Sequence, residues 1–310
     1  MPIRNKFGDA HIDERRPSTL VLGIGGAGRN IVEDIGELPS SSVKIYEVGT
    51  SSRPPKLSFL SISREDMKDA YDSELEVKER PLTESEAKLK RLIKNFKIVY
   101  LIAGLGGKTG SWTVPTCAEI SKSHCSLTMG LLAKPFESES KMRRELSEES
   151  QAESLKYLDM SAVFPNSRLL EINPNLPIKK AFEVMNRIIQ LPILDLNSVI
   201  TKRDIPQIKN FCKKIDEFKI GAAYGSGRKK GERAAKEALK SPWLGASTDF
   251  KKVFTIITTG KNEATIDAKD ALDVIQRSWP EADIMWGLKE ESGIKERMRV
   301  TILAGKQNKI

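Results

Sequence analysis

The segment from residue 98 to residue 112 constrains the fold of this chain most strongly. It begins with the apolar run Ile98-Val99-Tyr100-Leu101-Ile102-Ala103 and continues through four glycines, Lys108, Thr109 and Ser111. An apolar run that ends in glycine predicts a buried strand. Glycines let backbone amides approach an anion closely, and the N-terminus of a following helix favours negative charge. The segment therefore predicts a phosphate-binding loop between a strand and a helix.

Other interpretations of this loop need the context of the whole chain. The Walker A pattern G-x-x-x-x-G-K would place Ile102 where its first glycine belongs, so the spacing excludes a Walker A loop. Glycine-rich loops also end strands without binding a ligand. The loop alone leaves phosphate binding and a simple turn open.

A second glycine pattern occurs earlier in the chain and supports a rival function. Gly23, Gly25 and Gly28 match G-x-G-x-x-G between an apolar run and a helix start, and Glu47 ends the next apolar run. In a dinucleotide-binding fold the glycines would approach the pyrophosphate and the acid would bind the adenine ribose. A nicotinamide-dependent oxidoreductase of the Rossmann type is therefore an alternative.

Composition excludes several other classes. The 310 residues suffice for two domains, and 39% hydrophobic with 30% charged residues is typical of a soluble globular protein. No apolar run is long enough to span a bilayer and the N-terminus has no signal core, so we expect a cytoplasmic protein. The net charge of +9 is dispersed, which argues against a nucleic-acid partner. Three cysteines without CxxC spacing and two histidines predict no metal cluster.

Strand and helix patterns alternate through the first half of the chain. The sequence predicts strands at 18–24, 43–47, 98–103 and 127–133, and short strands at 161–164 and 169–172. It predicts helices after residue 25, from Thr83 to Phe96 behind a Thr83/Glu86 capping box, and over 114–123 and 141–158. Residues 50–82 read as loops with short elements. The alternation predicts a doubly wound parallel sheet.

The second half has a different pattern. Residues 178–199 predict a long, largely apolar helix with a kink or break at Pro192. A polar loop over 201–207 and a helix to about Phe218 follow. Helices are expected at 232–240 and 268–278, and strands at 253–258, 283–286 and 298–304 should form a smaller mixed sheet.

Taken in order, the motifs resemble those of the FtsZ/tubulin superfamily, and FtsZ more than eukaryotic tubulin. Gly25-Gly26-Ala27-Gly28-Arg29-Asn30 is similar to the family loop GGAGxN, and residues 103–111 are similar to AGMGGGTGTG, the signature loop of the family. Further similarities run from Lys134 to Arg143 (TxPFxxE…R), over 164–170 (IPNDRLL), from Ala181 to Asn186, and over 233–244, 256–260 and 299–305. The resemblance covers roughly residues 18 to 305.

The resemblance implies a domain layout and a site. After a polar leader over 1–17, which the residues themselves indicate, it implies a Rossmann-like nucleotide-binding domain over 18–175, a central helix over 176–200 and a smaller α+β domain over 201–310. It implies GTP or GDP, with Mg²⁺, as the bound cofactors. The residues that it implies for nucleotide binding are Gly25, Gly26, Gly28, Asn30, Gly106, Gly107, Lys108, Thr109, Gly110, Glu139, Arg143, Asn166, Phe182 and Asn186. Among these, Glu139 and Arg143 would meet the ribose, Asn166 and Asn186 the guanine edge, and Phe182 the face of the base.

Several positions depart from the family pattern. Arg187 replaces the acid that accepts from the guanine N1 and N2 donors, and arginine has no acceptor. Lys108 and Trp112 replace glycines of the signature loop, and Lys108 would add a point charge on phosphate. The second loop reads Val48-Gly49-Thr50-Ser51, and the third, GAGGNPxxG, is not recognisable between Ile62 and Thr83.

The catalytic loop differs most. Where the family has NxDxxD, this chain has Lys202, Asp204 and Gln207, so one carboxylate remains and an amide replaces the second. Because losing a positioned acid–base group typically lowers a rate by ~10²- to 10⁴-fold, we expect slow or absent hydrolysis by Asp204 and Gln207 in a neighbouring subunit's site. Lys202 and Arg203 are an alternative pair of cations for the neighbour's γ-phosphate. The chain ends at Ile310, five residues after Gly305, which predicts no membrane tether of the FtsZ type.

The sequence hypothesis is an FtsZ-like, guanine-nucleotide-binding cytoskeletal protein. It self-associates head to tail, hydrolyses GTP weakly or not at all, and has itself and cell-division or cytoskeletal proteins as partners. The alternatives are a non-polymerising paralogue that binds or regulates a partner, and the NAD-dependent oxidoreductase.

Overall fold

A computed structural model describes residues 4–5, 16–33, 35, 42–50, 55–172, 175, 177–215, 217–245, 247, 249–260 and 265–306. The chain divides into two compact units. The first unit is Asp13–Gln190, and the second is Leu191–Ile310 together with Met1–Ile12. This division falls inside the long helix, whereas the domain boundaries at residues 175 and 200 stay predictions. Most of the predicted leader, 1–17, lies outside the described residues.

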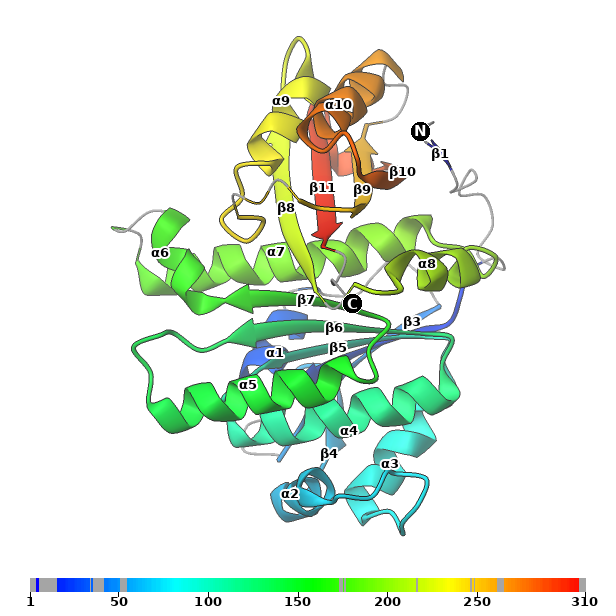
Figure 1. The fold of residues 1–310 in the computed structure, drawn as a ribbon, viewed down its shortest axis with the longest axis vertical. Helices are drawn as coiled ribbons and strands as arrows, with labels where there is room; N and C mark the ends of the chain where they lie inside the picture. The colour runs from blue at the N-terminus through cyan, green and yellow to red at the C-terminus, as the bar shows by residue number, and fades with distance from the viewer. Residues whose placement is uncertain are drawn as a thin grey trace. The chain divides into compact units, whose positions relative to one another are not determined.

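A parallel six-stranded sheet forms the centre of the first unit, in the order β7-β6-β5-β2-β3-β4 (Figure 1). Its strands are β2 (Thr19–Ile24), β3 (Val43–Gly49), β4 (Ser58–Ser61), β5 (Ile98–Gly104), β6 (Leu127–Lys134) and β7 (Met160–Pro165). Nearly every residue of β2, β5 and β6 is buried, as expected of strands covered on both faces. The strand order reverses between β2 and β5, so a crevice forms at their carboxyl ends.

Helices cover both faces of this sheet, which confirms the predicted doubly wound fold. They are α1 (Gly25–Glu33), α2 (Arg64–Asp72), α3 (Glu84–Ile93), α4 (Lys108–His124), α5 (Lys141–Leu155), the short η2 (Asn166–Arg168) and α6 (Leu169–Ile172), and the first part of α7 (Ile178–Val199). Leu22 and Leu101 share one core with residues of α2, α3 and α4. On the other face, α1 packs against β5, and Gln190 of α7 donates to the Ile31 carbonyl of α1 (2.8 Å).

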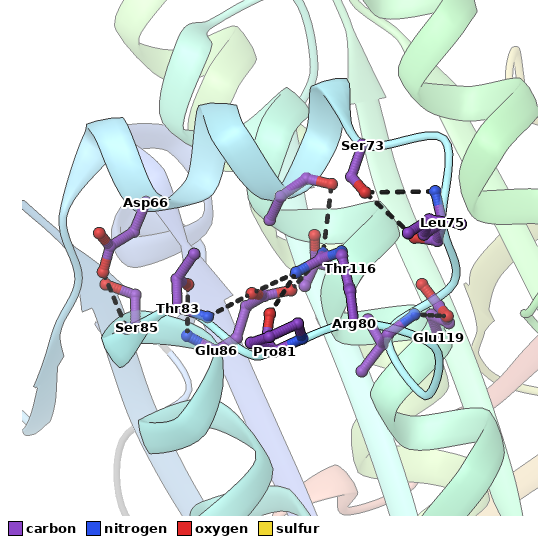
Figure 2. Close-up of polar contacts among 12 residues, drawn as sticks. Asp66, Ser73, Leu75, Arg80, Pro81, Thr83, Ser85, Glu86, Thr116 and Glu119 are labelled. Atoms are coloured by element: carbon purple, nitrogen blue, oxygen red, sulfur yellow. Dashed lines mark hydrogen bonds and ion pairs between the residues drawn. The ribbon is translucent and has the colours of Figure 1, made fainter.

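The segment between α2 and α4 is held by buried ionic contacts (Figure 2). Thr83 and Glu86 form the predicted capping box at the start of α3. The fully buried Glu86 also accepts two hydrogen bonds from Arg80 (2.7 and 2.9 Å). The helix ends at Ile93 instead of Phe96. The predicted start of α3 is therefore confirmed, and the segment before it contains β4 and α2.

Helix α4 begins at Lys108 instead of near residue 114, directly after the glycine loop. Pro115 lies inside it and has no amide proton for the carbonyl of Ser111. The Ser150 hydroxyl of α5 donates to that carbonyl instead (2.8 Å). This substitute hydrogen bond lets the helix run through the proline to the loop.

The predicted long helix over 178–199 is confirmed as α7, which does not break at Pro192, whereas a kink there stays a prediction. Two other local predictions were wrong. Residues 169–172 form the helix α6 instead of a strand. The helix expected up to Phe218 ends at Cys212, because α8 (Ile205–Cys212) is followed by the strand β8 (Phe218–Gly225).

The second unit contains a smaller mixed sheet, as predicted, in the order β1-β10-β9-β11-β8. Besides β8, the strands are β1 (Arg4–Asn5), β9 (Lys252–Thr259), β10 (Asp283–Glu290) and β11 (Met298–Gly305). Strand β11 is antiparallel to β8 and β9, whereas β9, β10 and β1 are parallel. The helices α9 (Lys230–Ala238) and α10 (Thr265–Ser278) pack on its core, and η3 (Ser292–Ile294) precedes β11.

A buried carboxylate joins the end of α7 to this sheet. Asp195 is fully buried and accepts from Arg299 (2.5 Å), Thr301 (2.7 Å) and Lys289 (3.2 Å). Three donors on one carboxylate compensate the loss of its hydration. The network fixes the last turns of α7 within the second unit.

Candidate functional site

A cavity of about 680 Å³ lies within the first unit, beyond the carboxyl ends of its central strands. Its wall includes residues that follow β2, β5, β6 and β7, together with Arg64 of α2 and part of α7. Of the sequence-predicted site residues, it contains Gly25, Gly26, Asn30, Gly107, Lys108, Thr109, Gly110, Glu139, Arg143, Asn166, Phe182 and Asn186. The fold thus brings together segments from residue 25 to residue 186.

The two glycine loops interlock at one end of this cavity. A side chain on Gly104 would meet the Ala27 methyl at 2.7 Å, and one on Gly25 would meet the Gly110 amide nitrogen at 3.2 Å. Gly25 has a φ of +70°, in the left-handed region that favours glycine. These contacts set the two loops at a fixed distance from each other.

Gly26 and Gly107 have a different role, because a Cβ at either position would meet nothing within 4 Å. Packing within the chain does not require a glycine there. Both residues line the cavity, so their missing side chains leave space in it. The exposed backbone around Gly26 and Gly107, which we call the glycine cradle, fits a ligand that approaches the backbone closely.

Two helices begin at this cradle. Helix α1 starts at Gly25 and α4 at Lys108, and the N-cap residue of α4, Gly107, supplies no side-chain acceptor. The first amides of a helix have no partner within the helix, and its dipole places partial positive charge there. Two such N-termini at one cavity form an anion-binding end, which we call the glycine end.

The opposite end of the cavity combines an aromatic ring with amides. Phe182 lines it and meets Phe136 edge to face, with ring centroids 6.1 Å apart. Asn166, the first residue after β7, has a buried Oδ1 without a hydrogen-bond partner in the described part of the chain. Because an unpaired buried acceptor is unfavourable, a donor group of a ligand in the cavity would compensate this atom. A planar base with N–H groups on its edge fits this end.

Glu139 and Arg143 lie on the cavity wall as a pair. Their side chains approach to 2.5 Å, and Glu139 also accepts from the Phe136 amide (2.9 Å). Arg143 donates to the Gly106 carbonyl (3.3 Å). The pair therefore ties α5 to the signature loop and keeps polar groups facing the cavity.

Two predicted site glycines lie outside the cavity lining. A side chain on Gly28 would meet the Ile102 carbonyl at 2.2 Å, so this glycine allows α1 to pack on β5. Gly106 has a φ of +84°, and a Cβ added to it would lie 2.8 Å from the Arg143 carbonyl oxygen. Both shape the glycine end through the backbone.

Glu47, the predicted ribose ligand of the oxidoreductase hypothesis, is occupied within the protein. It is fully buried and accepts from Arg29 Nε (2.6 Å) and from the amides of Lys56 (2.8 Å) and Leu57 (3.0 Å). Burial raises the pKa of this carboxyl, but the hydrogen bonds from Arg29 and the two amides outweigh burial and hold the pKa below its usual value. The carboxylate holds β3 to α1 instead of facing a ligand.

Arg64, the first residue of α2, is a cavity residue that was not predicted from the sequence. Ser63 caps this helix, and a serine followed by acidic residues is a helix-start signal. That signal locates the helix, but it does not show that the first residue reaches a cavity formed by loops 40 residues away. Arg64 lines the cavity and also a smaller adjoining hollow of about 340 Å³ with Gly25, Gly26 and Thr109.

The donor set of the glycine end does not fit a Mg²⁺ ion held by the protein. Protein sites for Mg²⁺ use one or two carboxylates besides the substrate phosphates. The acidic residue among the described lining residues is Glu139, which is paired with Arg143. No group of three or more His, Cys, Asp or Glu gathers for a metal in the described ranges.

The predicted catalytic residues belong to the second unit. Asp204 is buried and its Oδ2 accepts from the Thr201 amide (2.8 Å) and hydroxyl (2.6 Å). Gln207 is exposed in the first turn of α8. Arg187, which replaces the family's acid, is exposed on α7. Trp112 packs against the core of the first unit instead of lining the cavity.

Comparisons with known proteins lead to one family. The family described as "Tubulin/FtsZ family, GTPase domain" matches residues 58–174. The "Cell division protein FtsZ 1" of Archaeoglobus fulgidus is 27% identical over 304 residues, covering 94% of this chain and 83% of that protein. Among the helices that the structure describes, none is long and apolar enough to cross a membrane.

Solved structures show the same fold. "FtsZ dimer, empty (M. jannaschii)" superposes with a TM-score of 0.78 at 23% identity and covers 96% of this chain and 94% of that chain. "CetZ2 from Haloferax volcanii", a GTPγS-bound protofilament by its description, superposes with a TM-score of 0.72 at 13% identity and covers 94% of each chain.

Proposed function

Because this chain belongs to the tubulin/FtsZ family and is a distant homologue of archaeal FtsZ, we propose that it binds a guanine nucleotide in the cavity of the first unit. In this proposal it self-associates head to tail and hydrolyses GTP slowly. The observation that carries the proposal is the cavity itself. It joins an open glycine cradle at two helix N-termini to an aromatic ring and a buried, unpaired Asn166 oxygen.

The nucleotide would lie along the length of the cavity. Its phosphates would contact the backbone of Gly25, Gly26 and residues 107–110, where amides and helix dipoles favour negative charge. Glu139 and Arg143 would meet the ribose. The guanine ring would lie against Phe182, and its N–H groups would donate to Asn166 Oδ1.

Self-association is supported by the relatives. The descriptions of two structures with this fold name a dimer and a protofilament. We expect this protein to pellet in sedimentation with GTP and to remain in solution without nucleotide. Absence of pelleting at high concentration with bound nucleotide would favour the alternative, a non-polymerising paralogue that binds a partner.

Slow hydrolysis follows from the residues at the start of α8. An amide stands at Gln207, and the remaining carboxylate, Asp204, accepts two hydrogen bonds from Thr201. An amide orients water but does not take a proton from it. Both features reduce the acid–base capacity that this loop would bring to a neighbouring subunit.

A gain-of-function substitution tests this account of hydrolysis. Gln207→Asp restores a carboxylate in the first turn of α8, where negative charge suits the helix dipole. We expect phosphate release from GTP to rise about tenfold or more, because a positioned acid–base group contributes ~10²- to 10⁴-fold. Gln207→Asn is the matched control and should leave the rate unchanged. Rapid turnover by the natural chain, with no gain in Gln207→Asp, would contradict slow hydrolysis.

A further inference from the structure

The positions of two cations indicate how the glycine end neutralises an anion. Arg64 is the first residue of α2 and Lys108 is the first residue of α4, and both line the cavity. A positive side chain in the first turn of a helix is repelled by the helix dipole. Neither position is electrostatically favourable for folding, so an anion in the cavity would compensate both.

Arg64 lacks the partners that its neighbours have. Lys68 pairs with Asp72 in α2, Arg80 pairs with Glu86, and Lys88 pairs with Glu84 in α3. The Arg64 side chain is exposed and joins no described residue by an ion pair or hydrogen bond. Its guanidinium is therefore available to a ligand of the cavity.

The adjoining hollow places Arg64 at the glycine end. It is lined by Arg64 together with Gly25, Gly26 and Thr109, which belong to the proposed phosphate cradle, and with Thr50 after β3. The opposite end, with Asn166 and Phe182, is absent from the lining of this hollow. A group that extends from the cradle into the hollow would be the outermost phosphate of the chain.

The charges of the described lining residues favour a triphosphate. Glu139 is neutralised by Arg143, which leaves the positive charges of Arg64 and Lys108 unbalanced. Guanidinium groups bind phosphate oxygens with charge-assisted, bidentate hydrogen bonds. Since the carboxylate among the described lining residues, Glu139, is already paired with Arg143, these two cations would supply the neutralisation that a metal otherwise provides.

We propose that Arg64, with Lys108, binds the terminal phosphate of a nucleoside triphosphate, so that this site prefers triphosphate over diphosphate and binds it without requiring Mg²⁺. This inference rests on the proposed function, because it assumes a nucleotide in the cavity. Arg64 is a specificity-determining residue for the outermost phosphate, distinct from the backbone contacts that both nucleotides share.

Equilibrium titration with fluorescent GTP and GDP analogues tests the inference in the full chain. The variant is Arg64→Glu, since glutamate in the first turn suits the dipole of α2 and preserves the helix. Its matched control is Lys179→Glu, which makes the same charge change on an exposed residue in the first turn of α7, outside the cavity lining. Circular dichroism melts confirm that both variants are folded.

We expect Arg64→Glu to weaken GTP binding by about tenfold or more and GDP binding by less than about threefold, from the strength of charge-assisted hydrogen bonds. Lys179→Glu should change neither. Replacing Mg²⁺ by EDTA should weaken GTP binding to the natural chain by less than about threefold.

Equal effects of Arg64→Glu on GTP and GDP, no effect on either, or loss of GTP binding in EDTA would overturn the inference while leaving nucleotide binding in place. If the natural chain binds neither nucleotide, the proposed function fails first and this inference fails with it. Nucleotide titration of the natural chain therefore shows whether the proposed function or only the inference about Arg64 has failed.

Discussion

The buried ion pair of Arg29 with Glu47 joins the helix that carries the first glycine loop to the neighbouring strand. Both side chains are almost completely buried, at 3% and 0% exposed, and Arg29 also lies over the Phe59 ring at 5.0 Å. A buried charge that loses its partner is strongly unfavourable. The pair therefore contributes to the position of α1 at the cavity.

Replacing this carboxylate has a predictable effect on stability. We expect Glu47→Gln to lower the free energy of unfolding at pH 7 by about 3–5 kcal/mol, because the buried group at residue 47 loses the charge that Arg29 and two backbone amides stabilise. Denaturant titration measures the change. Glu65→Gln, on the exposed face of α2, is the control and should shift the value by less than about 0.5 kcal/mol.

The free energy of unfolding of Glu47→Gln should also depend on pH differently from that of the natural chain. Because the folded-state pKa of Glu47 lies below the usual 4.5, its contribution to stability is complete above that value and is lost as pH falls through the folded pKa. The gap between the natural chain and Glu47→Gln should therefore narrow below about pH 4.5. A constant gap down to pH 3 would show that the carboxylate is not stabilised by Arg29.

Among the elements, α1 separates two roles that glycine has in this site. Gly28 is required by packing against β5, whereas Gly26 faces open space. The sequence pattern treats these glycines alike, because G-x-G-x-x-G carries no information about which positions touch the protein and which touch a ligand. The three-dimensional contacts make the distinction.

This difference predicts opposite outcomes for two substitutions in one helix. Gly26→Ala should leave stability unchanged or raise it by about 0.5–1 kcal/mol, since alanine is the better helix former, while it weakens nucleotide binding. Gly28→Ala should destabilise the fold, because its methyl group would lie 2.2 Å from the Ile102 carbonyl. Thermal melts and nucleotide titration check both; unchanged nucleotide binding in Gly26→Ala would show that the cradle holds no ligand.

The elements that the sequence did not predict have tertiary causes. Strand β8 contains glycine and alanine, which have low strand propensity, and it forms by pairing along its whole length with β11. Helix α4 starts early because Ser150 of another helix compensates Pro115. In contrast, the buried strands β2, β5 and β6 were predictable, since their apolar runs require cover on both faces.

On the scale of the whole molecule, family resemblance predicted most of the cavity wall, because both glycine loops and the segments after β6 and β7 keep their order and spacing. Arg64 was not predictable, since the third family loop is unrecognisable and only folding brings α2 to the cavity. The catalytic roles of Asp204 and Gln207 remain predictions. Those roles would require contacts between subunits, which a single chain does not contain.

We propose that one guanine nucleotide occupies the cavity of the first unit. Equilibrium titration with GDP, with ADP as competitor, measures this binding and its selectivity for guanine. Asn166→Leu should weaken GDP binding without lowering stability, because the Oδ1 of Asn166 has no partner in the described part of the chain. We predict saturable binding of one GDP per chain that ADP does not displace; no saturation up to about 1 mM, or equal competition by ADP, would contradict the account.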